Sequence, residues 1–185
     1  MQRELVERAQ AGDHEAFSVL VRGSFDRVLG IARLVLRDPD RAQDAAQEAL
    51  VLSWKHIRAL RDADAWDAWL YRLTVRSCYR SARTVRRRDH VELHVMPDVD
   101  VAFEDDFSVS VVERDRLLRA LDRLPIEQRT LIVLRFYADL PLPEVAAILD
   151  IPVGTAKSRL HRCLATLRRT LAADRPIAEI RVESA

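Results

Sequence analysis

The sequence predicts an all-α protein made of two small helical domains. Leu, Ala, Arg and Val recur at intervals of three and four residues, whereas only 4 of the 185 residues are Gly and strand-like alternation is nearly absent. Apolar residues make up 49% and charged residues 32% of the chain, which is typical of a globular protein with one domain or two small ones. An acidic stretch near the middle separates two groups of helical segments.

The first group is predicted to be a four-helix bundle over residues 1–90. Two segments share an apolar stripe and are separated at Ala11-Gly12-Asp13, where Asp13 can cap the second. A third helix begins at Asp38-Pro39 and runs to about Ile57, because a capping residue followed by proline favours a helix start. The fourth begins at Asp62-Ala63-Asp64 and ends in the basic run 86–88. The stripe of the first two segments comprises Leu5, Ala9, Phe17, Leu20, Val21, Phe25, Val28, Leu29, Ala32 and Leu36.

Residues 91–110 are predicted to form an acidic, flexible linker. The stretch 89–115 has nine acidic residues against a single base, Arg114, which gives a net charge of −8. Pro97 and the alternation of Val with Asp support no helical stripe. The linker therefore divides the chain into two domains.

The second domain is predicted over residues 111–173, followed by a short unassigned tail, 174–185. Ser110 can cap a helix over 111–124, and Pro125 separates it from a helix over 126–138. Pro141 and Pro143 open a short helix that ends at Leu149. A turn over 150–153 then leads into a last helix that starts at Gly154 and ends near Ala173.

The last predicted helix is apolar on one side and basic on the other. The segment from Ile151 to Ala173 contains five basic residues and no acidic residue, and Asp150 immediately precedes it. A short helix, a turn and a second helix with a basic outer face form a helix-turn-helix, whose second helix fits the major groove of B-DNA. A solvated basic face is the alternative, but ordinary exposed helices mix charges of both signs. The predicted DNA-contacting residues are Thr155, Lys157, Ser158, Arg159, His161 and Arg162.

A second basic face follows the fourth predicted helix, and its spacing suits a phosphate backbone. Four aromatic residues are interleaved with it, of which Tyr71 falls on the apolar side and at most one or two are expected to contact nucleic acid. The arginines on one face are Arg72, Arg76, Arg80, Arg83 and Arg87, and the aromatics are Trp66, Trp69, Tyr71 and Tyr79.

The residue types predict a binding protein without catalytic activity or cofactor. A phosphate-cradling Gly loop, a metal cluster and a nucleophile-base pair are all missing from the sequence patterns. Cys78 and Cys163 are expected to be buried free thiols, and His90 with His94 is interpreted as a solvated pair rather than a metal site. The absence of a signal-peptide or membrane-spanning pattern predicts a cytoplasmic protein without membrane insertion.

Five motifs, in this order, resemble those of extracytoplasmic-function sigma factors, the two-domain bacterial factors that direct RNA polymerase to promoters. The motifs are AGDHEAF at 11–17, DAAQEALVLSW at 44–54, AWLYRL at 68–73, LDRLPIEQR at 121–129 and IPVGTAKSRLHR at 151–162. The resemblance spans about residues 1–172.

The resemblance implies a role for each domain. The first domain would be sigma region 2, in which Asp44, Gln47 and Glu48 would bind core RNA polymerase. Residues 56–65 and the following helix would recognise and melt the minus-ten element, contacting the non-template single strand. The second domain would be sigma region 4, which binds the minus-thirty-five element as duplex DNA. A cognate anti-sigma factor is a further implied partner.

Some positions depart from the family pattern. Arg76 and Arg80 stand where members commonly have Asn and Asp, so stronger dependence on phosphate contacts is expected. Pro141 replaces a frequent capping Ser, and Asp150 replaces a frequent Gly. Two alternatives remain at this stage: a stand-alone helix-turn-helix regulator that binds duplex DNA without polymerase, and a helical adaptor for acidic proteins. The acidic linker, through Glu104, Asp105 and Asp106, is also a candidate shield for the basic faces.

Overall fold

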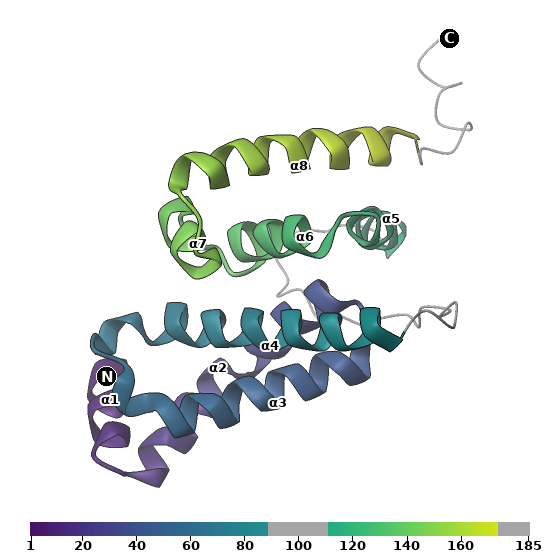
Figure 1. Cartoon of the computed structure of the whole chain (residues 1–185). Helices are drawn as coiled ribbons and strands as arrows, with labels where there is room; N and C mark the ends of the chain where they lie inside the picture. The colour runs from purple at the N-terminus through teal and green to yellow at the C-terminus, as the bar shows by residue number, and fades with distance from the viewer. Residues whose placement is uncertain (89–110, 174–185) are drawn as a thin grey trace.

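The computed structural model describes residues 1–88 and 111–173, and every element within those ranges is helical (Figure 1). The all-α prediction is therefore confirmed. The predicted linker, the pair His90 and His94, the acidic cluster 104–106 and the tail lie outside the described residues. The α-helices are α1 (Gln2–Gln10), α2 (His14–Leu36), α3 (Pro39–His56), α4 (Trp66–Arg88), α5 (Val111–Asp122), α6 (Ile126–Ile132), α7 (Leu142–Leu149) and α8 (Val153–Ala173).

Two helix starts follow the predicted caps. The Asp13 carboxylate accepts hydrogen bonds from the backbone N–H groups of Glu15 and Ala16 at 2.9 and 3.0 Å, and α2 begins one residue later. These backbone bonds, together with Arg8, hold the pKa of Asp13 below its usual value. Asp38 accepts from the backbone N–H of Arg41 at 3.0 Å, with Pro39 as the first residue of α3.

Three local features differ from the prediction. Ala63–Ala65 forms a 3-10 turn before α4, and the Asp62 carboxylate accepts from the N–H of Asp64 at its start. Val133–Tyr137 is a π-helical turn that continues α6, closed by the bond from the N–H of Ala138 to the carbonyl of Val133 at 3.0 Å. Finally, α8 begins at Val153, one residue earlier than predicted.

Most of the predicted apolar stripe of α1 and α2 lies in the core, but Val21 is only half-buried, and Phe25 is 40% exposed, so the predicted place of Phe25 in the core is wrong. Val6, which the predicted stripe omits, is fully buried. The stripe residues that are buried or packed against the core are Leu5, Ala9, Phe17, Leu20, Val28, Leu29, Ala32 and Leu36. The C-terminal half of α2 is buried more widely than a single stripe allows, because a second layer of helices covers another of its faces. The additional buried residues are Gly30, Ile31, Leu34 and Val35.

The two groups of helices pack against each other in layers (Figure 1). Helix α2 contacts α6 and the π turn, and α4 contacts α7. Helix α8 is the layer farthest from α1–α4 (Figure 1). One hydrophobic cluster includes buried residues of both groups, from Val6 in α1 to Leu167 in α8. The interior is therefore continuous from one group of helices to the other.

Candidate nucleic-acid interface

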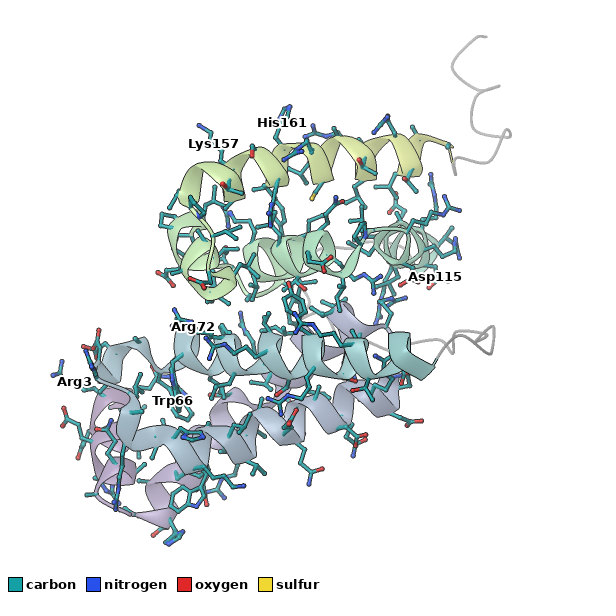
Figure 2. All side chains as sticks on the ribbon, viewed as in Figure 1. Arg3, Trp66, Arg72, Asp115, Lys157 and His161 are labelled. Carbon is teal, nitrogen blue, oxygen red and sulfur yellow. The ribbon has the colours of Figure 1, made fainter. Side chains whose placement is uncertain are left out.

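The outer face of α8 carries the predicted duplex-DNA contacts. Lys157 and His161 point away from the other helices (Figure 2), and Ser158, Arg159 and Arg162 are likewise exposed, while Thr155 is half-buried. On the opposite face, Ala156, Cys163 and Leu167 are buried against the domain core. The amphipathic pattern thus places Lys157, Ser158, His161 and Arg162 on the outer side of α8, with Thr155 and Arg159 toward its edges. Arg159 lines a small pocket together with Glu127 and Gln128 of α6.

The turn between α7 and α8 has the connectivity of a helix-turn-helix. Helix α7 ends at Leu149, and Asp150 takes a left-handed conformation with φ 56° and ψ 49°. The N–H of Ile151 donates to the carbonyl of Ala146 at 3.1 Å, and α8 begins two residues later. The combination of a left-handed residue and this bond terminates α7 and turns the chain sharply into α8. Asp150 therefore occupies the left-handed position that ends α7, where Gly is the more common residue.

We expect Asp150→Gly to stabilise the second domain by about 0.5–1 kcal/mol, because a residue with a β-carbon is strained in the left-handed region. Asp150→Asn is the matched control, since it removes the same charge from the C-terminal end of α7 but keeps the β-carbon. Urea denaturation followed by circular dichroism measures both. Equal stability of the Gly and Asn variants would show that charge, and not backbone conformation, sets the effect.

The arginines on the basic face of α4 differ in how accessible they are. Arg76, Arg80 and Arg83 are exposed, as the prediction requires. Arg72 instead points toward the second domain (Figure 2), where its Nη2 donates to the carbonyl of Ala147 in α7 at 3.2 Å. The side chain of Arg87 lies outside the described part of the structure. Three of the five predicted arginines therefore present an accessible surface in this conformation.

The predicted polymerase-binding residues lie on α3, beside the basic face of α4. Asp44 and Gln47 are exposed, whereas Glu48 is half-buried and its carboxylate forms a salt bridge with Arg80. A residue predicted to bind polymerase and one predicted to bind DNA are thus paired with each other. Arg80 is one of the two positions at which the sequence analysis expects a departure from the family pattern, and this salt bridge depends on that residue.

The four aromatic residues of α4 are mostly structural. Trp66 is completely buried, and its indole N–H donates to the Ser24 hydroxyl at 3.1 Å. Tyr71 is also in the core, as predicted, where burial raises its pKa to about 12. Tyr79 is half-buried, and burial raises its pKa. Trp69 is half-buried, with its ring centroid 5.8 Å from that of Trp66.

Sequence reasoning missed a group of arginines that hold the domains together. Arg37 follows α2 and pairs with Asp122 at the end of α5. Arg129 donates to four backbone carbonyls, three at the end of α5 and one in α2, and burial lowers its pKa. Arg129 lies within the motif LDRLPIEQR, but nothing in that pattern indicates which carbonyls it would bind.

Two further predictions concern sites of other kinds. Cys78 and Cys163 are buried free thiols, as expected, and burial raises the pKa of Cys78 to about 12. Within residues 1–88 and 111–173, no cluster of His, Cys, Asp or Glu is arranged to hold a metal ion. Over the same ranges, no helix has the length and hydropathy needed to cross a membrane.

Comparison with protein families and relatives agrees with the two-domain division. Residues 20–88 match the model of sigma-70 region 2, and residues 114–167 match that of sigma-70 region 4. RNA polymerase sigma-H factor of Pseudomonas aeruginosa is 30% identical to this chain, with 91% of this chain and 93% of that protein covered. The ECF RNA polymerase sigma factor SigM of Mycobacterium tuberculosis is 31% identical, with 91% and 83% covered.

Solved structures share the fold. CnrH, in complex with the cytosolic domain of CnrY, has a TM-score of 0.71 at 24% identity and covers 94% of this chain and 99% of its own. The sigma factor RpoE of Bartonella quintana, in complex with the anti-sigma factor NepR, has a TM-score of 0.72 at 23% identity, with 86% and 98% covered. These findings favour a polymerase factor over a stand-alone regulator or an adaptor. The chain therefore belongs to the sigma-70 family, among the extracytoplasmic-function sigma factors that bind core RNA polymerase and direct it to promoters.

Proposed function

We propose that three surfaces of this sigma factor each bind a different partner during transcription initiation. Asp44, Gln47 and Glu48 on α3 bind core RNA polymerase. The basic face of α4, with Arg72, Arg76, Arg80, Arg83 and Arg87, binds the minus-ten region. The outer face of α8 binds the minus-thirty-five element as duplex, and the protein acts in the cytoplasm as a binding factor without catalytic activity. The observation that carries the proposal is the presence of two basic helix faces in different domains, with an acidic surface beside one of them.

The charge and placement of α8 support its part in this proposal. Its exposed bases are unaccompanied by any acidic residue along the helix. Two polar side chains near its N-terminus are also fixed locally: the Ser158 hydroxyl donates to the carbonyl of Thr155 at 3.0 Å, and Arg162 Nε donates to that of Ser158 at 3.3 Å. The guanidinium Nη groups of Arg159 and Arg162 suit guanine O6 and N7, and the first N–H groups of the helix suit a phosphate.

The pair of Glu48 with Arg80 supports a link between polymerase binding and DNA binding. In the free protein this salt bridge holds Arg80 toward α3 rather than toward DNA. When basic side chains of the polymerase form salt bridges with Glu48 in place of Arg80, the Arg80 guanidinium becomes available to bind a phosphate. Because the pair is largely exposed, with 60% and 37% of the two side chains accessible, its own contribution to stability is small and the exchange costs little.

We expect the double substitution Asp44→Asn and Glu48→Gln to weaken core-polymerase binding by on the order of tenfold, with duplex-DNA binding unchanged. The triple substitution of Lys157, Arg159 and Arg162 by Ala has the opposite profile, a loss of about a hundredfold or more in duplex binding with core binding intact. Controls are Asp40→Asn, an exposed acid at the start of α3, and Arg168→Ala, an exposed base beyond the first turns of α8.

The measurement is transcription with core RNA polymerase on a pooled promoter library, combined with fluorescence titration of core and of duplex. Starts that share two upstream elements are expected with the wild-type chain. Loss of duplex binding in the α3 variant, or of core binding in the α8 variant, would contradict the assigned surfaces.

A further inference from the structure

The loop between α3 and α4 is anchored by a buried residue at every third position. It contains the 3-10 turns Ile57–Ala59 and Ala63–Ala65 and leads directly into α4. A repeat of three residues is that of a 3-10 helix, so one side of the loop packs into the core and the other faces solvent. The buried residues are Ile57, Leu60, Ala63 and Trp66, and the exposed ones are Arg58, Ala59, Arg61, Asp62 and Asp64.

Gln10, the last residue of α1, binds the first of these turns through its side chain. Its amide Nε2 donates to the carbonyl of Ile57 at 3.1 Å and to that of Leu60 at 2.6 Å. The two carbonyls lie at the first residue of the turn and at the residue that follows it. Because a side-chain amide carries two N–H donors, one glutamine can bind both acceptors. Gln10 therefore fixes the two ends of the turn relative to each other and to α1.

The backbone of Gln10 contacts the same turn. Arg58 Nε donates to the carbonyl of Gln10 at 3.2 Å. This carbonyl belongs to the last turn of α1, where helical carbonyls lack an intrahelical partner. Hydrogen bonds therefore run in both directions between Gln10 and the turn.

The other polar contacts between α1 and this region lie at the surface. Arg3 Nη1 binds Asp64 Oδ2 at 2.9 Å, and Gln2 Nε2 donates to Asp67 Oδ2 at 3.1 Å. The side chains of Arg3 and Asp64 are 61% and 63% exposed, so water competes for this pair and its contribution is small. The Gln10 side chain is half-buried, and its bonds to Ile57 and Leu60 are partly sheltered from water. Gln10 is therefore expected to contribute most of the polar restraint that α1 places on the loop.

The position of the loop bears on how the minus-ten strand is read. The arginines of α4 are proposed to bind phosphates, and phosphate contacts set the register of a strand without carrying sequence information. Bases are discriminated by groups that keep a fixed place relative to that register, to within about 0.5 Å. The loop leads into α4 through the completely buried Trp66 and presents polar side chains to solvent. It is thus placed to contact bases beside the phosphates that α4 binds.

We propose that Gln10 is a positioning residue for minus-ten recognition, which acts by holding the loop 57–65 in the conformation that contacts the bases of the non-template strand. The proposal rests on the proposed function of the first domain at the minus-ten region. Gln10 itself contacts the loop and not the DNA. Its loss therefore reduces discrimination among bases more than it reduces affinity for core polymerase or for DNA as a whole.

The test removes the two side-chain bonds and keeps the shape of the residue. Gln10→Met has a similar length and helix propensity but no N–H donor, and Gln10→Glu places a carboxylate against the two carbonyls. The matched control is Val6→Ala, because Val6 is completely buried on the same helix and its truncation weakens the packing of α1 without removing a bond of Gln10. Circular dichroism during urea denaturation measures the stability of each full-length variant.

Two measurements follow the loop and its effect on promoter choice. Hydrogen exchange of the amides of residues 57–65 reports the loop in the free protein. Transcription with core RNA polymerase on a library randomised in both promoter elements gives the ratio of transcript yield between the most and the least favoured base at each position. Fluorescence titration gives the affinity for core polymerase.

We expect exchange in the loop to be about tenfold faster in Gln10→Met, and the discrimination ratio in the minus-ten element to fall about fivefold to tenfold, as for the loss of two partly sheltered hydrogen bonds. Gln10→Glu should show an effect at least as large. Discrimination in the minus-thirty-five element and the affinity for core polymerase should match the wild type. Val6→Ala should lower the denaturation midpoint and retain the wild-type ratio in both elements.

Two results would overturn the proposal. One is a wild-type minus-ten ratio in Gln10→Met, whether or not exchange in the loop is faster. The other is an equal loss of that ratio in Val6→Ala, which would show that Gln10 acts only through the stability of the domain. Failure of the proposed function is a different result, since the wild-type protein would then give no transcription starts that share two upstream elements.

Discussion

Replacement of Arg129 by Met is expected to destabilise the second domain by about 3 kcal/mol or more. The guanidinium donates to the carbonyls of Leu121, Asp122 and Leu124 at 3.1–3.2 Å, and to Val35 in the other domain. Three of these carbonyls belong to the end and exit of α5, where no intrahelical partner exists. Removal of the donor leaves the carbonyls of Asp122, Leu124 and Val35 without this partner, whereas that of Leu121 keeps the N–H of Leu124. Each unsatisfied buried acceptor costs on the order of 1–3 kcal/mol.

The measurement is urea denaturation monitored by two signals. All three tryptophans, Trp54, Trp66 and Trp69, lie in the first domain, so their fluorescence reports that domain, whereas circular dichroism at 222 nm reports both. Arg129→Met should shift the circular dichroism transition most strongly. Arg129→Lys should lie in between, because one ammonium group cannot reach four carbonyls, and Arg119→Met, at an exposed position of α5, should stay within about 0.5 kcal/mol of the wild type. A loss below about 1 kcal/mol for Arg129→Met would contradict the capping role.

Replacement of Trp66 by Ala is expected to cost about 3–5 kcal/mol in the first domain. The indole is completely buried at the start of α4 and packs edge-on against Phe17, with ring centroids 6.2 Å apart. Its N–H bond to Ser24 ties α4 to α2 across the bundle. The substitution removes this packing and leaves both a cavity and a buried hydroxyl without its partner.

Trp66→Phe separates the two contributions. The Phe variant retains most of the apolar area but loses the bond to Ser24, so a loss of about 1–2 kcal/mol is expected. Thermal and urea denaturation followed by the fluorescence of Trp54 and Trp69 measure the remaining stability. If Trp66→Ala left the transition of the first domain in place, the stabilising role of the buried ring would be contradicted.

The pattern around Trp66 does not by itself distinguish a buried from an exposed aromatic residue. In the sequence it is one of four aromatics among arginines, which is typical both of a single-strand binding face and of a helix that crosses a core. Only the position of α2 beside α4 decides between these interpretations. By contrast, the positions of Asp13 and Asp38 before their helices depend on local backbone geometry, so the sequence predicts these caps correctly.

The sequence pattern also predicts the basic outer face of α8. The 3.6-residue period places Lys157, His161 and Arg162 opposite Ala156 and Cys163, whatever the rest of the fold does. The contact that Arg72 makes could not be predicted in this way. It belongs to the same helical face as Arg76 and Arg80, but the end of α7 happens to lie over it.

The sequence by itself determined the helical class, the two domains, the caps at Asp13 and Asp38 and the basic face of α8, because each is specified by residues within a few positions of one another. The predicted cap Ser110 lies outside the described residues. The tertiary structure alone decided how the domains meet. The contact of Gly30 with Tyr137 joins residues that are far apart in the chain, and so does the bond between Arg37 and Asp122. Neither contact produces a recognisable periodicity or motif in the sequence, since such contacts depend on the relative placement of whole helices rather than on local backbone preference.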